Sequence, residues 1–327
     1  MNIVEIPEAP CPAGGTVGWL ERPDGAQLRT MVWPSAAASP RRGTVVLANG
    51  RTEFIEKYFE VITLLLERGF AVATFDWRGQ GFSTRMLDDP RKGHIDSFST
   101  FDADFVAFMD EVVRPQFSGP FIGVGHSMGG NLMLRAAHNL PDTFSAVVLS
   151  APMLGLNVGS PFVERVMRSL ISLLSAVGAG KAFALGSGPE AADEEPFEEN
   201  IVTSDPVRYR RQQAVIEKVP SIGLGGPTTV WVREAFRSVD EIAEPSYLTK
   251  VVAPVLLFAA SKDRLVRGTS IREIAAQLPN AECVTIEGSA HEILMEREIY
   301  RDAFWTAFDG FMNKTLGTAR EQASVNA

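Results

Sequence analysis

The sequence feature that most constrains this chain is a serine between two glycines, where an apolar run meets a helical stretch. Residues 125–129 read Gly-His-Ser-Met-Gly, directly after the apolar run 121–124 and before the helical stretch 131–139. A serine on so sharp a turn between strand and helix projects its hydroxyl from the sheet edge, and the glycines let neighbouring backbone approach without Cβ clashes. We therefore predict that Ser127 is a nucleophile. The alternative is a glycine-rich turn that carries an incidental serine.

Short apolar segments alternate with helical stretches over most of the chain. The expected strands are residues 44–48, 71–75, 121–125, 146–150, 255–259 and 281–286, and the expected helices are residues 55–68, 101–114, 131–139, 269–277 and 297–313. Continuous apolar strands separated by helices indicate an α/β fold, with a mostly parallel central sheet and helices on both faces. Two alternating segments, 17–21 and 28–33, precede this pattern and predict an opening hairpin.

The alternation stops between residues 151 and 247, and we interpret this segment as an inserted helical cap over the serine. The cap divides the core into a first part, residues 1–150, and a second part, residues 248–315. Residues 316–327 are small and polar and are expected to be disordered. An independent helical domain, remote from the serine, is the alternative interpretation of the inserted segment.

Within the expected cap, residues 162–177 form a helical stretch that is apolar almost all round. It is too short and too charged to span a bilayer, so a buried helix, or one that faces a lipid-like ligand, suits it better. We expect three of its side chains, Phe162, Met167 and Leu170, to contact substrate, and the cap to make peripheral contact with a membrane. Asp205 followed by Pro206 predicts the start of a further cap helix.

A serine hydroxyl needs a base within hydrogen-bond reach, and the base needs a third group that fixes its tautomer. The chain has four histidines. His126 adjoins the serine and cannot turn back to it, His138 lies two turns along the following helix, and His94 lies in an earlier loop that can line the mouth of the site. His291 follows the last expected strand, at the sheet edge where sites in such folds collect, and we predict that it is the base.

The acid is expected in the loop after the preceding strand, because in this topology the order along the chain is serine, acid, histidine. Asp263 is the only carboxylate in residues 260–263, which follow the strand 255–259. A surface turn aspartate beside Lys262 is the alternative. Asp240 and Asp302 are the fallback acids, although neither follows a strand.

The oxyanion of a tetrahedral intermediate needs two preorganised N–H donors. We assign one to the backbone of Met128, after the nucleophile, and the other to the backbone of Arg51, in the loop 49–52 after the first core strand. The Arg51 guanidinium has two candidate roles. It can meet an anionic substrate group or pair with Glu53, and the ion pair is the expected one.

Composition excludes several other classes of protein. A net charge of −9 argues against a nucleic-acid partner. Residues 1–15 lack the basic and apolar regions of a secretory signal, and Cys11 and Cys283 form neither a disulfide framework nor a metal site with the histidines, so we expect a cytoplasmic protein without a metal. The glycine turn at residues 76–81 lacks the helix start that a dinucleotide-binding loop requires, and no cofactor is expected.

These residues together resemble the α/β-hydrolase superfamily, and within it the monoacylglycerol lipase and bacterial lysophospholipase branch. The resemblance spans residues 16–313, and the segments most similar to bacterial lysophospholipases are residues 49–53, 93–98, 225–234 and 291–294. It implies a Ser-Asp-His serine hydrolase that acts on a lysophospholipid or a monoglyceride. One departure lies in the oxyanion loop, where many relatives carry His-Gly and this chain carries Asn49-Gly50. The change keeps the backbone donors but removes a side chain that could orient the loop.

The same three residues, Ser127, Asp263 and His291, are also compatible with other functions. An aminopeptidase or amidase would need cap carboxylates for the substrate amine, and residues 190–199 could supply them. Cofactor-free perhydrolysis is a further alternative. A dehalogenase or epoxide hydrolase would carry aspartate in place of Ser127, and a non-enzymatic ligand-binding protein of this fold would be expected to lose a member of the triad. Acyl length, head group and oligomeric state are not encoded in these patterns.

Overall fold

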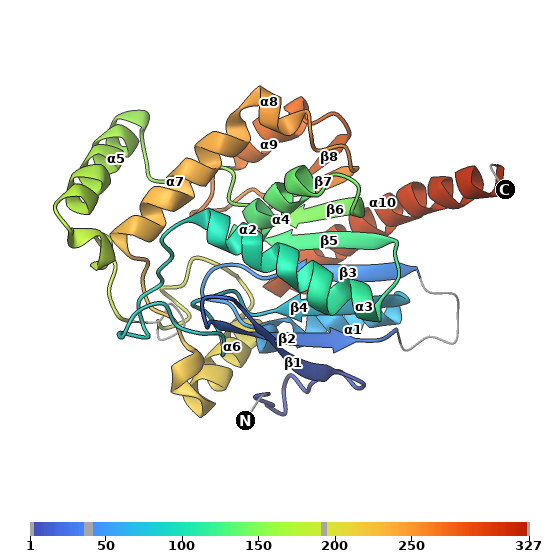
Figure 1. Ribbon diagram of the computed structural model, residues 1–327, viewed down its shortest axis with the longest axis horizontal. Helices are drawn as coiled ribbons and strands as arrows, with labels where there is room; N and C mark the ends of the chain where they lie inside the picture. The colour runs from blue at the N-terminus through green and yellow to red at the C-terminus, as the bar shows by residue number, and fades with distance from the viewer. Residues whose placement is uncertain (1–2, 36–41, 191–194, 326–327) are drawn as a thin grey trace.

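An eight-stranded sheet forms the centre of the protein in the computed structural model, which describes residues 3–35, 42–190 and 195–325, residues 318–325 as backbone only. The strands are β1 (Thr16–Glu21), β2 (Gln27–Trp33), β3 (Gly43–Ala48), β4 (Phe70–Phe75), β5 (Phe121–His126), β6 (Phe144–Ser150), β7 (Val255–Ala260) and β8 (Ala281–Ile286). Their order across the sheet is β1-β2-β4-β3-β5-β6-β7-β8 (Figure 1). The strands from β3 to β8 are parallel to one another, whereas β1 and β2 form an antiparallel hairpin that joins the sheet at β4.

The burial of the strands explains this arrangement. Every residue of β3, β4 and β7 is buried, as continuous apolar strands require when both faces of the sheet are covered. At the far edge, β8 exposes Glu282 and Cys283, where one side of the strand is unpaired. The predicted mostly parallel α/β sheet and the predicted opening hairpin are both confirmed.

Helices cover both faces of the sheet. The α-helices are α1 (Phe59–Glu67), α2 (Phe98–Ala107), α3 (Arg114–Gln116), α4 (Met128–Asn139), α5 (Pro161–Ala176), α6 (Pro206–Lys218), α7 (Thr229–Ala243), α8 (Pro245–Leu248), α9 (Gly268–Gln277) and α10 (Glu298–Val325). Shorter elements are the π-helix Phe108–Val113 and the 3-10 turns Ile55–Tyr58, Ala179–Lys181, Pro220–Ile222 and Ile293–Met295. Figure 1 shows α1 and α10 on one face, and α2, α4 and α9 on the other.

The C-terminal helix differs from the expectation. Helix α10 continues to Val325, beyond the expected end of the core at residue 315, and the disorder predicted for residues 316–327 stays a prediction. The tail is small and polar, but alanine, arginine, glutamate and glutamine are strong helix formers and extend the helix that precedes them. Residues 326–327 lie outside the described residues.

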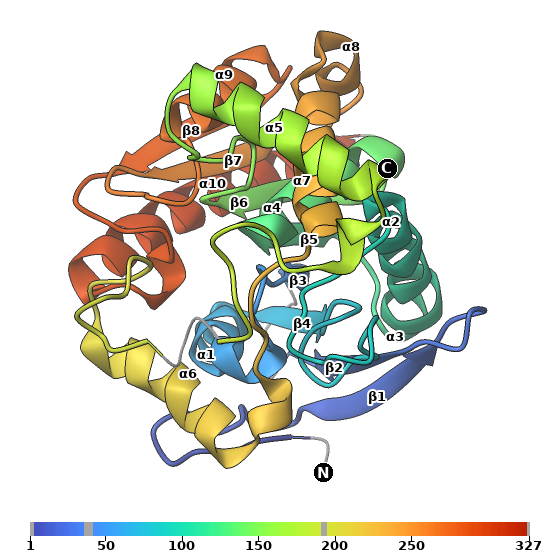
Figure 2. The same ribbon diagram turned by 90° about the vertical axis from the view of Figure 1, so that its left-hand side faces the viewer.

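The segment between β6 and β7, which the sequence predicts to be a cap, contains helices α5, α6 and α7. Figure 1 places α5 and α6 beyond the carboxyl ends of the parallel strands, and Figure 2 shows α5 lying across α7. Helix α7 in turn packs on the core helices α2 and α4, where Ser238 donates to Asn131 at 2.7 Å and Arg135 pairs with Glu241 at 2.6 Å. The predicted start of α6 at Asp205 is confirmed, because its carboxylate accepts the N–H groups of Val207 and Arg208.

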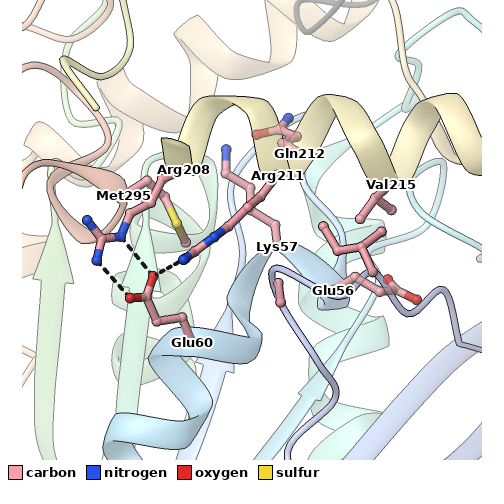
Figure 3. Close-up of a pocket in the computed structure, with 10 residues that line it drawn as sticks. Glu56, Lys57, Glu60, Arg208, Arg211, Gln212, Val215 and Met295 are labelled. Atoms are coloured by element: carbon pink, nitrogen blue, oxygen red, sulfur yellow. Dashed lines mark hydrogen bonds and ion pairs between the residues drawn. The ribbon is translucent and has the colours of Figure 1, made fainter. Parts of the chain in front are cut away.

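Ion pairs attach α6 to the core. Glu60 of α1 accepts from Arg208 at 2.7 Å and from Arg211 at 2.8 Å, both of α6, as Figure 3 shows. The Glu60 carboxylate also meets Arg301 of α10 at 3.1 Å. Burial raises the pKa of Glu60, but the three guanidinium groups outweigh it and lower the pKa to about 2. One carboxylate therefore ties the cap to two core helices.

Helix α5 is present where the sequence predicts it, but its environment differs from a buried helix. Of its residues only Ile171 is buried, while Phe162 is 70% exposed and Leu173 is 58% exposed. Among the helices of the described residues, none is long and apolar enough to cross a membrane.

Candidate active site

Ser127 lies at the junction of β5 and α4 in a conformation that non-glycine residues rarely adopt. Its φ is 51° and its ψ is −117°, a strained backbone that typically costs about 1–3 kcal/mol and persists only where the surroundings hold it. Three backbone hydrogen bonds hold it here. The Ser127 N–H donates to Ser150 at 3.1 Å, and the Ser127 carbonyl accepts from Asn131 at 3.1 Å and from Met153 at 2.9 Å.

The glycines beside the serine allow α4 to approach the sheet, as the sequence predicts. A Cβ at Gly125 would lie 2.5 Å from the Gly129 carbonyl oxygen, and one at Gly129 would overlap the carbonyl oxygens of Ala48 and Asn49. The helix N-terminus therefore meets the end of β3 directly. This contact brings Met128 next to the loop that follows β3.

The structure brings Asp263, His291 and Ser127 together in one chain of hydrogen bonds. His291 lies in the loop after β8, with Nδ1 2.6 Å from Asp263 Oδ2 and Nε2 2.9 Å from Ser127 Oγ. Asp263 lies in the loop after β7, where its Oδ1 accepts the N–H groups of Leu265 at 2.8 Å and Val266 at 2.9 Å. The carboxylate orients the imidazole so that Nε2 can accept the serine proton.

The pKa shifts of Asp263 and His291 agree with this geometry. Burial would lower the pKa of His291, but the charge and hydrogen bond of Asp263 outweigh it, and the net pKa is raised. Burial would raise the pKa of Asp263, but His291 and the two loop N–H groups outweigh it, and the net pKa is lowered. At neutral pH the carboxylate is therefore ionised and ready to stabilise an imidazolium.

The other candidates for base and acid are placed elsewhere. His94 Nδ1 lies 2.8 Å from Thr228 Oγ1, and His138 stacks on Tyr247 with ring centroids 3.7 Å apart. His126 Nδ1 lies 3.1 Å from the Ser150 carbonyl oxygen, and its ring centroid lies 4.9 Å from that of His291. The fallback acids are also remote from the serine, because Asp240 pairs with Arg168 and Asp302 is an exposed residue of α10.

Two backbone N–H groups are available beside the serine. Met128 is the first residue of α4, so its N–H has no acceptor inside the helix. The N–H of Arg51 has no acceptor among the described residues. Both residues line the cavity that contains Ser127 and His291. The residues of the two predicted oxyanion donors therefore line the same cavity as Ser127, and their role stays a prediction.

A buried network that the sequence analysis missed holds the oxyanion loop. Glu53 accepts the N–H of Gly50 and, at 2.6 Å, the hydroxyl of Tyr58. Gln80 reaches the other side of the loop, where its amide donates to the Gly50 carbonyl at 2.9 Å and accepts the Thr52 N–H at 3.1 Å. Glu53 and Gln80 thus take the orienting role that Asn49-Gly50 was expected to lack.

Lys57 compensates the charge of this network. Its ammonium lies 3.0 Å from Glu53 and 2.6 Å from Glu292, the residue after His291. Burial raises the pKa of Glu53, but Lys57 and His126 outweigh it and lower the pKa to about 2. The spacing of four residues between Glu53 and Lys57 is the sequence signal that could have revealed the pair.

Glu53, His126 and Glu292 also offer ligand atoms within 4.8 Å of one another, a distance that a metal ion could bridge. The Lys57 ammonium already contacts both carboxylates, and it supplies the positive charge that an ion would bring. The donor set therefore fits an ion-pair cluster better than a metal centre.

The expected ion pair between Arg51 and Glu53 is wrong. Glu53 pairs with Lys57, whereas the Arg51 guanidinium donates to the Gly225 carbonyl and lies 5.4 Å from the ring centroid of Trp231. The physical reason is that Lys57, four residues beyond Glu53, holds its buried ammonium 3.0 Å from the carboxylate. Arg51 then extends beneath the loop at residues 223–227.

Two cavities lie beside α7. The first, of about 400 Å³, contains Ser127 and His291. The second, of about 370 Å³, lies along α5 and is lined by Phe162, Met167 and Leu170, the three expected substrate contacts. These three residues do not line the first cavity, but Val232 lines both. The acidic segment at residues 189–200 contributes Glu195 to the first cavity, and its residues 191–194 lie outside the described residues.

Comparisons with known proteins place this site in a family. A family model described as serine aminopeptidase, S33, matches residues 39–298. Lysophospholipase L2 of Escherichia coli is 32% identical over 281 residues, which cover 83% of this chain and 80% of the relative. A probable lysophospholipase L2 of Haemophilus influenzae is 28% identical over 285 residues, 87% of each chain.

The fold is also similar to that of a solved enzyme. The crystal structure of a soluble variant of monoglyceride lipase from Saccharomyces cerevisiae matches with a TM-score of 0.69 and 22% sequence identity. The match covers 92% of this chain and 96% of the yeast chain.

Proposed function

Since the chain belongs to the serine aminopeptidase, S33, family of α/β-hydrolases and is a hydrolase, we propose that it cleaves lysophospholipids or monoacylglycerols at their carboxylic ester. The observation that carries the proposal is the chain of hydrogen bonds from Asp263 through His291 to Ser127, at 2.6 and 2.9 Å, in the wall of a cavity that borders an apolar groove. A nucleophile, its base and an apolar binding surface are the groups that lipid ester hydrolysis needs.

In the first half of the reaction, Ser127 Oγ attacks the ester carbonyl carbon while its proton passes to His291 Nε2. The carbonyl oxygen becomes an oxyanion and accepts the backbone N–H groups of Arg51 and Met128. When the intermediate collapses, the bond to the alcohol oxygen breaks, and His291 returns the proton to that oxygen. The products are an acyl-enzyme on Ser127 and the free glycerol derivative.

In the second half, water takes the place of the alcohol. His291 accepts a proton from the water as its oxygen attacks the acyl carbon, and the same two N–H groups hold the second oxyanion. The bond to Ser127 Oγ then breaks, and His291 returns the proton to the serine. Asp263 keeps the imidazole oriented and stabilises its charged form in both halves.

The activity should rise with pH through a single step. His291 accepts the serine proton only when it is neutral, so the charged fraction at low pH is inactive. Burial lowers its pKa and Asp263 raises it by more, which places the midpoint of kcat/KM above 6.5, the ordinary histidine pKa. Stopped assays with a soluble ester in overlapping buffers measure the profile. A flat profile between about pH 5 and 9 would contradict His291 as the base.

The second cavity supports a lipid acyl chain as the substrate group. Phe162, Met167 and Leu170 present an apolar surface along α5, and the groove that they line shares Val232 with the catalytic cavity. Phe162 is 70% exposed, and such a surface suits contact with the aggregates or membranes in which these lipids reside.

Specificity should therefore increase with acyl length. Each methylene that is buried contributes up to about 0.8 kcal/mol, so kcat/KM should rise severalfold for each two-carbon step until the groove is filled. Changing both Met167 and Leu170 to serine should flatten this dependence and leave hydrolysis of acetate esters largely intact. Leu173→Ser is the matched control, because Leu173 lies on the same helix, is 58% exposed and does not line the groove.

The measurement is kcat/KM against acyl length for the three proteins, with a melting temperature for each. If the double variant lowers all activities and the melting temperature together, the helix only packs the cap. A wild-type preference for acetyl over octanoyl esters would contradict a lipid substrate.

One observation favours a second candidate, an aminopeptidase. Glu195 lines the catalytic cavity, where its carboxylate could meet the free amine of a peptide. The other two glutamates that line this cavity, Glu53 and Glu292, are already paired with Lys57. Aminoacyl amides belong in the same substrate series. Faster cleavage of an aminoacyl amide than of a medium-chain monoacylglycerol would select this candidate over the lipid esterase.

A further inference from the structure

Arg51, which lines the catalytic cavity, is a cation without an acidic partner among the described residues. Arg51 is the only lysine or arginine among the described residues that line this cavity. Two other buried guanidinium groups near the sheet are paired with carboxylates, Arg29 with Glu56 at 2.6 Å and Arg78 with Asp104 at 2.8 Å, whereas Arg85, like Arg51, donates to carbonyl oxygens. No described carboxylate lies within ion-pair distance of Arg51.

The Arg51 guanidinium uses few of its hydrogen-bond donors. A guanidinium carries five N–H donors, and the Arg51 side chain donates to a single described acceptor, the Gly225 carbonyl. Its Nε is buried without a hydrogen-bond partner. Burial lowers the pKa of Arg51 to about 10, with no neighbouring acid to offset the effect. A charge held in this way is stabilised when an anion enters the cavity.

The position of Arg51 relative to the reacting ester limits what that anion can be. The backbone N–H of the same residue is a proposed oxyanion donor, so the guanidinium extends from a point beside the ester carbonyl. Trp231, whose ring centroid is 5.4 Å from the guanidinium, Gly93 and the Gly225 carbonyl form the adjacent wall. In a lysophospholipid, the glycerol backbone separates the ester from a phosphate, and in a monoacylglycerol the same place carries a hydroxyl.

We propose that the Arg51 guanidinium binds the phosphate of a lysophospholipid head group and thereby favours phosphate-bearing substrates over uncharged glycerides. This inference rests on the proposed lipid ester hydrolysis and names the substrate class within it. The planar fork of arginine donates two parallel hydrogen bonds to phosphate oxygens, and these charge-assisted bonds are about twice as strong as neutral ones. Lys57 cannot serve in this way because Glu53 and Glu292 already hold its ammonium.

The test compares two substrates on each protein. Lysophosphatidylcholine and monoacylglycerol with the same medium acyl chain are assayed below their critical micelle concentrations, and the ratio of their kcat/KM values is measured. Arg51→Gln should lower this ratio at least about tenfold, mainly through KM of the phospholipid, and Arg51→Lys should retain part of it. Arg233→Gln, an arginine of α7 outside the cavity, is the matched control and should leave the ratio unchanged.

An unchanged ratio in Arg51→Gln would overturn the inference even if both activities fall, because it would show that the residue acts only through its backbone. If the glutamine variant does not fold, Arg51→Lys provides the test, because a ratio equal to that of the wild type would overturn the inference.

A binding measurement separates this inference from the proposed function. In the Ser127→Ala background, ether-linked analogues of the two lipids cannot be hydrolysed and are titrated directly. The phosphate-bearing ether should bind more tightly than the glycerol ether, and adding Arg51→Gln should remove the difference. If the wild type hydrolyses neither lipid but this difference is present, the esterase proposal fails and the phosphate site stands. If hydrolysis occurs and the two ethers bind equally, the phosphate site fails alone.

Discussion

Replacing Ser127 with alanine is expected to lower kcat by about 10⁶-fold, and replacing His291 with alanine by a similar factor. The reason is geometric. Nε2 of His291 lies 2.9 Å from Ser127 Oγ, so neither group activates the attack without the other. Because the two act as one unit, the double variant should be about as slow as either single variant. Residual activity over water should remain, from the oxyanion donors and substrate binding.

Steady-state kinetics on a medium-chain ester measure these losses, and covalent labelling provides the control. A fluorophosphonate probe should label the wild type at Ser127 and should leave Ser127→Ala unlabelled. Circular dichroism of each variant establishes that it is folded. Labelling of another serine in the alanine variant, or a double variant much slower than both single variants, would contradict the assignment.

The second large effect is expected for Asp263→Asn, which should lower kcat by about 10⁴-fold. Asparagine has nearly the same shape and can still accept the N–H groups of Leu265 and Val266, so the loop should be retained. Its amide cannot stabilise the imidazolium, and it can hold His291 in the wrong tautomer. Because Asp263 raises the pKa of His291, the midpoint of the residual activity should also move to lower pH.

Asp240→Asn is the matched control for this prediction. Asp240 is the fallback acid from the sequence, and it pairs with Arg168 on the cap at 2.7 Å. Its substitution should leave kcat nearly unchanged. A larger loss in Asp240→Asn than in Asp263→Asn, or an unchanged pH midpoint in Asp263→Asn, would contradict the assignment of the acid.

Several parts of the site could be predicted from the sequence because they depend on local geometry. The backbone of Ser127, with φ of 51°, and the close approach at Gly125 and Gly129 follow from a short strand, turn and helix segment. Asp263 and His291 could be located because each follows a strand of a parallel sheet, and the carboxyl ends of such strands meet at one edge. Their hydrogen bonds connect residues that are 28 and 164 positions apart.

The partners of charged side chains could not be predicted in the same way. Both Arg51 and Lys57 lie close to Glu53 in the sequence, but Lys57 rather than the expected Arg51 pairs with it. The choice depends on which cation the packed core directs toward the carboxylate, and on Glu292, 235 residues further along, which shares Lys57. Burial then decides the electrostatic free energy of each cation. Burial disfavours a charge that has no partner, whereas an opposite charge nearby offsets that effect in an ion pair.

The chain sequence by itself determined the parallel sheet, the opening hairpin, the sharp turn at Ser127 and the helical segment between β6 and β7, because periodicity and glycine spacing act over a few residues. Only the tertiary structure decided that α5 exposes its apolar side chains above a groove, that Phe162, Met167 and Leu170 lie outside the cavity of Ser127, and that Arg51 is left without an acid. These features depend on which distant segments pack together, and the free energy of packing is a property of the whole fold rather than of any local pattern.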